Sequence, residues 1–209
     1  GSIALSADLV NQGGTLDVSG LRGGQIDVLA GQYTDSGTTL ADGSQQGGSI
    51  DVRAKNITQT SSAVVSASSS EGEGGRVELI GDLGHGIGQF GGKIYATGRR
   101  RGGFVDTSGA TVLIDDALRV NTSSAEGQAG TWLIDPNDFT IAASGGNITG
   151  SALSGNLANN DIIISTATQG TAGGNGDIFV RDNVTWSSGK ALTLNAERNI
   201  NILATIDAA

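Results

Sequence analysis

The sequence predicts an all-β protein built as a parallel β-helix, and three observations favour this fold class. Glycine accounts for 35 of the 209 residues and proline for 1, and turn and strand formers such as Ser, Thr, Asn and Asp fill much of the remainder. Glycines recur in pairs at a nearly constant interval. A short alternating apolar pattern follows each pair. Together these features predict short strands that coil and stack on one another.

The interval between glycine pairs sets the predicted size of one coil. The second glycines of successive pairs, with the glycine of "AGTWLID" last, are Gly24, Gly48, Gly75, Gly103 and Gly130, which gives steps of 24, 27, 28 and 27 residues. We therefore expect coils of roughly 20–28 residues, each hydrogen-bonded to the next. The pairs are expected at the bends, because a tight corner needs either positive φ or close backbone approach.

The residues after each glycine pair alternate in a way that is typical of a half-buried strand. The second and fourth positions are apolar, and period two places them on one face. These expected core residues are Leu16 and Val18, Ile26 and Val28, Ile50 and Val52, Val77 and Leu79, and Trp132 and Ile134. The intervening outward residues are mostly acidic: Asp17, Asp27, Asp51, Glu78 and Asp106, with Tyr95 and Leu133 as exceptions. We expect Asp106 to face water and Trp132 to fill the core.

The pattern loosens after Pro136, although strand segments resume near the end of the chain. "GGKIYATG", residues 91–98, predicts a strand on a different side of the coil. Leu153 and Leu157 lie four residues apart behind the N-cap formers Thr149 and Ser151, which predicts a short helix near 151–158. We expect one continuous β-helix over 1–209, with regular coils over 1–136 and less regular coils with the helical insertion over 137–209.

Composition argues against several classes of function. A formal net charge of -9 disfavours nucleic-acid binding, and the basic run Arg99-Arg100-Arg101 is interpreted as a solvated turn. The absence of cysteine excludes a disulfide framework and most zinc sites, and suits a chain that is exported unfolded. The chain begins "GSIALSADL" without methionine, so we expect an excerpt of a longer protein.

Two motifs resemble a known family. "GGFVDTSG", residues 102–109, is followed about two dozen residues later by "GTWLIDPNDFTI", residues 130–141. This pair resembles the region shared by filamentous-haemagglutinin-like adhesins of Gram-negative bacteria, including the high-molecular-weight adhesins exported by two-partner secretion. "NVTWSSGKALTLNAERNINI", residues 183–202, is also similar to their coils. The residues that mark the resemblance are Gly102, Gly103, Trp132, Asp135 and Pro136.

The resemblance implies a right-handed β-helix belonging to a secreted protein on the bacterial cell surface that mediates adhesion, aggregation or attachment to biofilm matrix. Its expected partners are glycans, exopolysaccharide or host-surface molecules, and an outer-membrane transporter for export, with no nucleic acid. We expect a monomer. The family is glycosylated on sequon asparagines, which makes the four sequon residues candidates: Asn56, Asn121, Asn147 and Asn183.

Candidate sites each have a plainer interpretation. Stacked on successive coils, the acidic row would repel itself and could bind Ca²⁺, but a solvated face that discourages aggregation is favoured. We expect no catalytic residue and no required metal or cofactor. The single histidine, His85, lies in a glycine turn, and adjacent residues such as Asp115 and Asp116 point to opposite faces of a strand. A β-helix polysaccharide lyase or hydrolase therefore stands as the alternative to an inert stalk or a ligand-binding segment.

Overall fold

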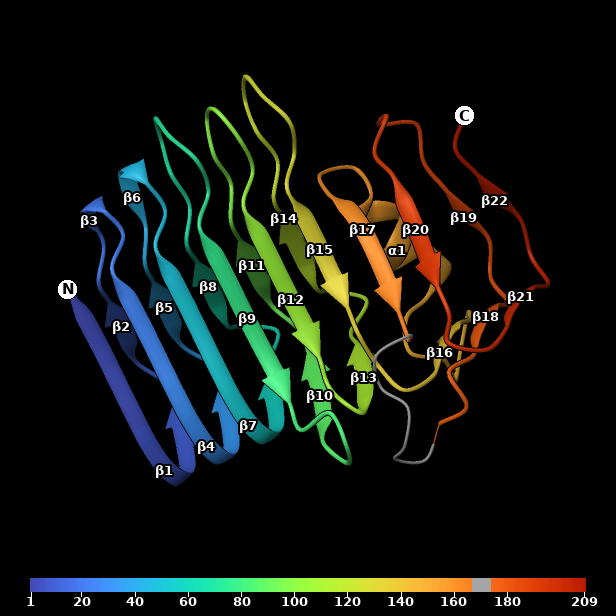
Figure 1. Cartoon of the computed structure of the whole chain (residues 1–209), viewed down its shortest axis with the longest axis horizontal. Coiled ribbons are helices and arrows are strands. Elements are labelled where there is room, and N and C mark those ends of the chain that lie inside the picture. The colour runs from blue at the N-terminus through green and yellow to red at the C-terminus, as the bar shows by residue number, and fades with distance from the viewer. Residues whose placement is uncertain (167–173) are drawn as a thin grey trace.

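The computed structural model describes residues 1–166 and 174–209 and shows a parallel β-solenoid of about eight turns. Strands of the largest sheet lie side by side in chain order along the long axis of the molecule (Figure 1). The fold class is thereby confirmed as nearly all-β with one short helix. Every strand pairing among the described residues is parallel, because each coil returns the chain in the same direction above the one before.

The largest sheet carries most of the coil-to-coil pairing. Its main path runs through β1 (Ser2–Gln12), β4 (Gln25–Asp35), β7 (Ser49–Gln59), β9 (Arg76–Gly81), β12 (Phe104–Ser108), β15 (Thr131–Ile134), β17 (Asp161–Ser165) and β20 (Leu192–Asn195). Off this path, β10 (Ile87–Phe90) pairs with β13 (Thr111–Ile114) and with β7. The glycine-pair repeat is therefore the coil repeat: Ile26 pairs with Ile50, and Ile50 with Val77.

Smaller sheets form the other sides of the coil. The second sheet contains β2 (Thr15–Asp17), β5 (Thr38–Leu40), β8 (Val64–Ser66), β11 (Lys93–Tyr95) and β14 (Arg119–Asn121). The remaining pairings join β3 (Gly20–Arg22) to β6 (Gly43–Gln46), β16 (Phe139–Ile141) to β18 (Ile178–Val180) and β21 (Ile200–Ile202), and β19 (Val184–Thr185) to β22 (Ile206–Asp207). Strand β11 confirms the prediction that "GGKIYATG" occupies a different side of the coil.

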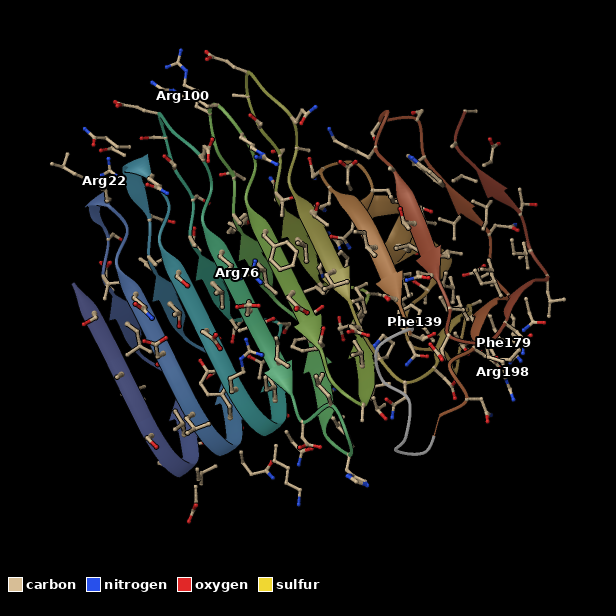
Figure 2. All side chains as sticks on the ribbon, in the orientation of Figure 1. Arg22, Arg76, Arg100, Phe139, Phe179 and Arg198 are labelled. Atoms are coloured by element: carbon tan, nitrogen blue, oxygen red, sulfur yellow. The ribbon has the colours of Figure 1, made fainter. Side chains whose placement is uncertain are left out.

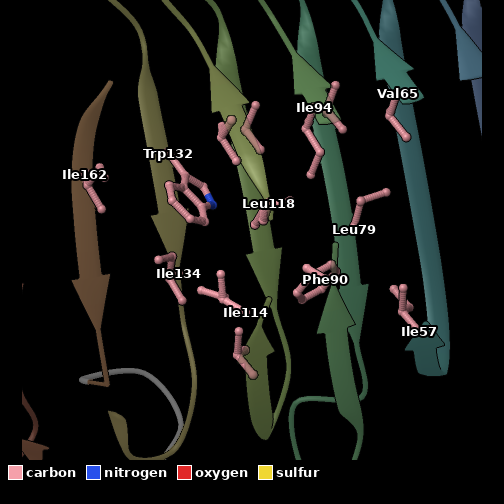
Figure 3. Packing of buried hydrophobic residues seen from close by; sticks show 14 of the residues in the cluster. Ile57, Val65, Leu79, Phe90, Ile94, Ile114, Leu118, Trp132, Ile134 and Ile162 are labelled. Carbon is pink, nitrogen blue, oxygen red and sulfur yellow. The ribbon is translucent and has the colours of Figure 1, made fainter. Parts of the chain in front are cut away.

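The core is a column of apolar side chains enclosed by the coils (Figure 3). Ile26, Ile50 and Val77 stack in one buried row, and each has no exposed surface. Trp132 continues this row and is fully buried, as expected, with its Nε1 donating to Thr107 Oγ1 at 2.9 Å. Because no coil can bury its apolar row alone, each turn depends on its neighbours.

The glycine pairs that set the coil repeat are required by close approach and not by positive φ. A Cβ at Gly103 would lie 2.1 Å from the carbonyl oxygen of Gly75, and one at Gly102 would lie 1.8 Å from that of Thr122. Among the described residues, positive φ is confined to Gly92, Gly145, Gly176 and Gly189. Close approach therefore explains the pairs that set the coil repeat, whereas positive φ applies to Gly92 of the pair Gly91–Gly92.

The predicted helical excursion is α1 (Gly150–Asn156), close to the expected range of 151–158. Thr149 is the N-cap, and its side-chain oxygen accepts the Ala152 N–H at 3.1 Å. Leu153 and Leu157 are fully buried against the solenoid core. Helix α1 therefore belongs to the same hydrophobic unit as the strands. In the described ranges, no helix has the length and apolar character needed to span a membrane.

Candidate functional site

A groove of about 880 Å³ crosses the solenoid along the stacked glycine pairs. Its floor is formed by Gly23–Gly24, Gly47–Gly48, Gly74–Gly75, Gly102–Gly103 and Gly130, one set from each of five coils. Because adjacent coils stack about 4.8 Å apart, the floor is roughly 20 Å long. The absence of side chains at these positions is what makes the surface hollow there.

The backbone donors of the floor are already used between and within coils. Gly75 N–H donates to Ala67 O at 2.7 Å, and Gly103 N–H donates to Ala96 O at 2.7 Å. The first glycines of the pairs behave similarly, since Gly74 N–H donates to Arg101 O at 2.9 Å. A ligand in the groove would therefore be recognised chiefly by the side chains along its two edges.

One edge of the groove, which we call the loop edge, consists of Arg22, Gln46, Glu73 and Arg101. These residues are brought together by backbone pairing in register, from Arg22 to Gln46, from Gln46 to Glu73 and from Glu73 to Arg101. Arg22 Nη1 donates to Gln46 Oε1 at 3.0 Å. Figure 2 shows Arg22 and Arg100 near the projecting loops of the solenoid. Of the two, only Arg22 lines the groove.

The opposite edge, the sheet edge, is the first outward row of the large sheet. It consists of Ser2, Gln25, Ser49, Arg76, Phe104 and Thr131. The Arg76 guanidinium lies over the Phe104 ring, 4.2 Å from its centroid, and forms an ion pair with Glu78 at 2.7 Å. Three arginines and one glutamate thus line a groove in a chain whose net charge is -9.

The next outward row contains four of the five predicted acidic residues, and these four stack on successive coils, whereas Asp17 lies in β2 and pairs with Leu40. Asp27 pairs with Asp51, Asp51 with Glu78, and Glu78 with Asp106. Arg53 Nε lies 2.7 Å from Asp51 Oδ1, and Arg53 Nη2 lies 3.4 Å from Glu78 Oε2. The hydrogen bond from Arg76, together with its charge and that of Arg53, holds the pKa of Glu78 below its usual value. Arginine side chains therefore supply positive charge along this row.

The expectation that Asp106 faces water is wrong. Its side chain points outward from the sheet, yet the residue is only 6% exposed, because Phe104, Ser108, Glu78 and Leu133 flank it on its own and neighbouring strands. Burial raises the pKa of Asp106 to about 6, against a hydrogen bond from the Ser108 hydroxyl that favours the charged form. The alternation of the sequence predicted the direction of this side chain correctly but could not reveal its cover.

The remaining candidate polar residues are dispersed. His85 is exposed in the turn after β9, where its N–H donates to Asp82 Oδ1 at 2.7 Å. Asp115 Oδ1 accepts the Ala117 N–H, and Asp116 Oδ1 accepts the Thr149 hydroxyl at 2.6 Å. These contacts give the carboxylates of Asp82, Asp115 and Asp116 local structural roles, and the contact of His85 is made by its backbone. Over the described ranges, no set of three or more His, Asp or Glu side chains is arranged to hold a metal ion. Calcium binding by the acidic row stays the alternative to the solvated face that the sequence favours.

The four sequon asparagines occupy different environments. Asn147 is half-buried, and its Nδ2 donates to Val112 O at 2.6 Å. Asn56 Nδ2 donates to Gln32 Oε1 at 3.3 Å. Asn121 lies in β14 with its Oδ1 accepting the Ser123 N–H. Asn183 is exposed, and its side-chain Oδ1 accepts the Thr205 N–H at 3.0 Å. Asn183 is thus the most accessible of the four to a modifying enzyme.

The family-marker residues serve the coil. Gly102 and Gly103 form part of the groove floor, and Trp132 fills the core. Pro136 is buried and Asp135 half-buried directly after β15, where the chain leaves the large sheet. The sequence did not single out Arg22 and Gln46, and it interpreted Arg101 only as part of a solvated turn. The edge that these residues share depends on coil register, and the constant spacing of the glycine pairs was the available signal.

Comparisons with known proteins identify no relative. No protein-family model matches the chain, and neither the curated proteins nor the solved structures contain a match.

Proposed function

We propose that this chain is a β-helical segment of a secreted adhesin on the bacterial cell surface, acting in adhesion, aggregation or attachment to biofilm matrix. The observation that carries the proposal is the unbroken parallel pairing of the large sheet across about eight turns. Such a hydrogen-bonded stack is a stiff element that can hold binding surfaces away from a cell. Its full-length form would leave the cell through an outer-membrane transporter.

Surface features support the proposed role. The sheet faces present shallow polar rows and a long groove, which suit contact with extended glycans or exopolysaccharide at a cell surface. The acidic row and its arginine neighbours keep the exposed strands charged, which discourages side-to-side aggregation of rods. The motifs beginning at Gly102 and at Trp132 add the family resemblance as an independent reason.

The proposal is tested by coating beads with the purified chain and measuring their attachment to host cells and to biofilm matrix. Beads coated with an unrelated acidic protein of similar size are the control. Attachment several times above this control is expected. Attachment equal to the control on every surface would contradict a binding role and leave only a spacer.

A polysaccharide-processing enzyme is the second candidate, favoured by one observation. Glu78 and Asp106 are paired across neighbouring coils, and their pKa values are displaced in opposite directions, which is a pattern found in acid–base pairs. The burial of Asp106 weighs against direct contact with a substrate. Incubation with a panel of acidic and neutral polysaccharides, followed by chain-length analysis, tests this candidate: new reducing or unsaturated ends that disappear in Glu78→Gln would favour it over the adhesin.

A further inference from the structure

The glycine groove has the shape of a site for a linear polymer. It is floored by backbone from five coils, it is edged by two rows of side chains, and its floor is roughly 20 Å long. A compact ligand would contact only one or two coils. A chain that runs along the solenoid axis would contact side chains at every coil.

Two classes of linear polymer fit the groove poorly. An added peptide strand needs free backbone groups at a sheet edge, whereas the floor N–H groups of Gly74 and Gly75 already donate to Arg101 O and Ala67 O. A single-stranded nucleic acid needs successive aromatic platforms for its bases. Phe104 is the one aromatic residue among those lining the groove, and Arg76 lies over its ring.

The side chains of the groove combine two kinds of recognition. Arg22, Arg76 and Arg101 outnumber the single acidic residue, Glu73, and guanidinium groups bind carboxylates through charge-assisted hydrogen bonds. Amides and hydroxyls, which match sugar hydroxyls, lie among the arginines at Gln25, Gln46 and Ser49, and one coil beyond Arg101 at Thr131. Within the described part of the chain, the side chain of Arg101 has no hydrogen-bond or ion-pair partner and is exposed. Its guanidinium is therefore available to a ligand.

We propose that the glycine groove binds a linear acidic polysaccharide that lies across the coils, with its carboxylates on the arginines and its hydroxyls on the amides and hydroxyls between them. This inference rests on the proposed role as a binding segment and deepens it by assigning the site and the ligand class. Because the arginine contacts are exposed, binding is expected to weaken as salt rises.

The test compares four polymers of matched length by calorimetry. Alginate fragments carry a carboxylate on every sugar, dextran fragments are neutral, poly-glutamate carries carboxylates without sugar hydroxyls, and oligo-thymidylate is a single-stranded nucleic acid. Alginate is expected to bind at least about tenfold more tightly than the other three. One charge-assisted hydrogen bond can supply this difference from dextran, and one or two neutral hydrogen bonds from the sugar hydroxyls can supply it for the two charged polymers. Equal binding of poly-glutamate or oligo-thymidylate, or no binding of alginate, would overturn the proposal.

Neighbouring arginines provide a matched pair of variants. Arg101→Gln removes a charge that lines the groove, whereas Arg100→Gln removes the same charge from the adjacent residue, which lies outside it. Arg101→Gln is expected to weaken alginate binding about tenfold, and Arg100→Gln to leave it nearly unchanged. Ser49→Tyr fills the groove without altering its charge or its glycine floor, and should also reduce binding. Circular dichroism and melting curves establish that each variant is folded. Equal losses in the two arginine variants would contradict a site in the groove.

The bead assay separates this inference from the proposed function. Attachment of wild-type beads together with undiminished attachment of Arg101→Gln beads to an alginate-rich matrix would reject the groove and retain the adhesin. Absence of attachment by wild-type beads would reject the adhesin, and calorimetry would still decide whether the groove binds polysaccharide.

Discussion

Two buried carboxyl groups, Asp35 and Asp106, are predicted to make the solenoid more stable at pH 5 than at pH 7. Asp35 is 1% exposed and is stacked between Gln12 and Gln59. Its Oδ1 accepts the Gly37 N–H, whereas its Oδ2 and both polar atoms of the Gln59 amide have no hydrogen-bond partner among the described residues. Burial raises the pKa of Asp35 from 3.8 to about 6, as it does for Asp106. The folded state therefore favours the neutral form of both acids.

The sign of the pH effect follows from these raised pKa values. Each acid contributes stability that is fully present below its unfolded pKa of 3.8 and is lost as pH rises through about 6. Lowering the pH from 7 to 5 should stabilise the fold by about 1 kcal/mol for each group and raise the melting temperature by roughly 5 °C. Thermal melts at both pH values measure this change.

The control for this prediction is the double variant Asp35→Asn/Asp106→Asn, whose melting temperature should change little between pH 5 and 7. Glu78 acts in the opposite direction, because its pKa is lowered and its contribution disappears as pH falls below its ordinary value of 4.5. A wild-type chain that loses stability steadily from pH 7 to 5 would show that the two buried acids do not control the pH response.

Close backbone packing predicts a large effect of one methyl group at Gly103. A Cβ there would lie 2.1 Å from Gly75 O, and neither backbone can move without breaking the coil-to-coil hydrogen bonds. Gly103→Ala should lower the free energy of unfolding by about 3 kcal/mol in urea titrations. Gly14→Ala is the matched control, because a Cβ at Gly14 meets nothing within 4 Å and should change stability by less than about 0.5 kcal/mol. Similar effects at both positions would contradict the close-approach explanation.

At the scale of elements, α1 and the turn that follows it take the place of a strand beside β14. Sheet strands need a partner for their edge N–H and C=O groups, and two asparagine side chains provide one. Val120 N–H donates to Asn156 Oδ1 at 2.8 Å, and Thr122 N–H donates to Asn160 Oδ1 at 2.7 Å. In return, Asn160 Nδ2 donates to Val120 O at 2.9 Å. The two asparagine side chains thus present alternating acceptors and donors to the edge of β14, as the backbone of a neighbouring parallel strand would do.

Asn160→Asp is predicted to disrupt this edge. Asn160 is fully buried, and its Nδ2 donates to both Val120 O and Asn156 O. A carboxylate oxygen in that place would face two carbonyl oxygens, so we expect a loss of about 3 kcal/mol at neutral pH and a fall in melting temperature of roughly 10 °C. Part of the loss should be recovered near pH 4, where the neutral acid can donate one hydrogen bond.

The adjacent residue provides the control, because Asn159→Asp adds the same charge at a partly exposed position. Its melting temperature should stay within a few degrees of wild type. If the two variants melt alike, the asparagine side chains do not hold the edge of β14.

At the scale of the whole molecule, the sequence was informative wherever a property repeats. The glycine pairs reported the coil length, because a side chain at these corners would strike the neighbouring coil. The alternation after each pair reported which side chains face inward, such as Ile50 and Trp132. Both signals are local, and many coils repeat them.

Properties that depend on the register between coils could not be predicted from the sequence. The edge formed by Arg22 and Arg101 joins residues from different coils, and the hydrogen bond from Thr122 to Asn160 spans 38 residues. An asparagine in a turn-rich segment also predicts a loop on local grounds, which conceals its role as a strand substitute. The burial of Asp106 likewise arises from neighbours on adjacent coils.

The one-dimensional stacking of coils predicts that stability varies along the rod. Strands β4 and β7 are paired on both sides, whereas β1 pairs only with β4, and β21 and β22 each have one partner among the described residues. Ile26 and Ile50 are fully buried, but Ile202 is 57% exposed near the last strands. Because a coil is stabilised mainly by its interfaces with its neighbours, the terminal coils of the isolated chain should open at a smaller free energy than the central ones.

In hydrogen exchange followed by mass spectrometry, peptides from β4, β7 and β9 should exchange at least about tenfold more slowly than peptides from β21 and β22, which corresponds to about 1.4 kcal/mol in opening free energy. Uniform exchange across all coils would mean that the rod opens as a single cooperative unit, and would reject the nearest-neighbour description of its stability.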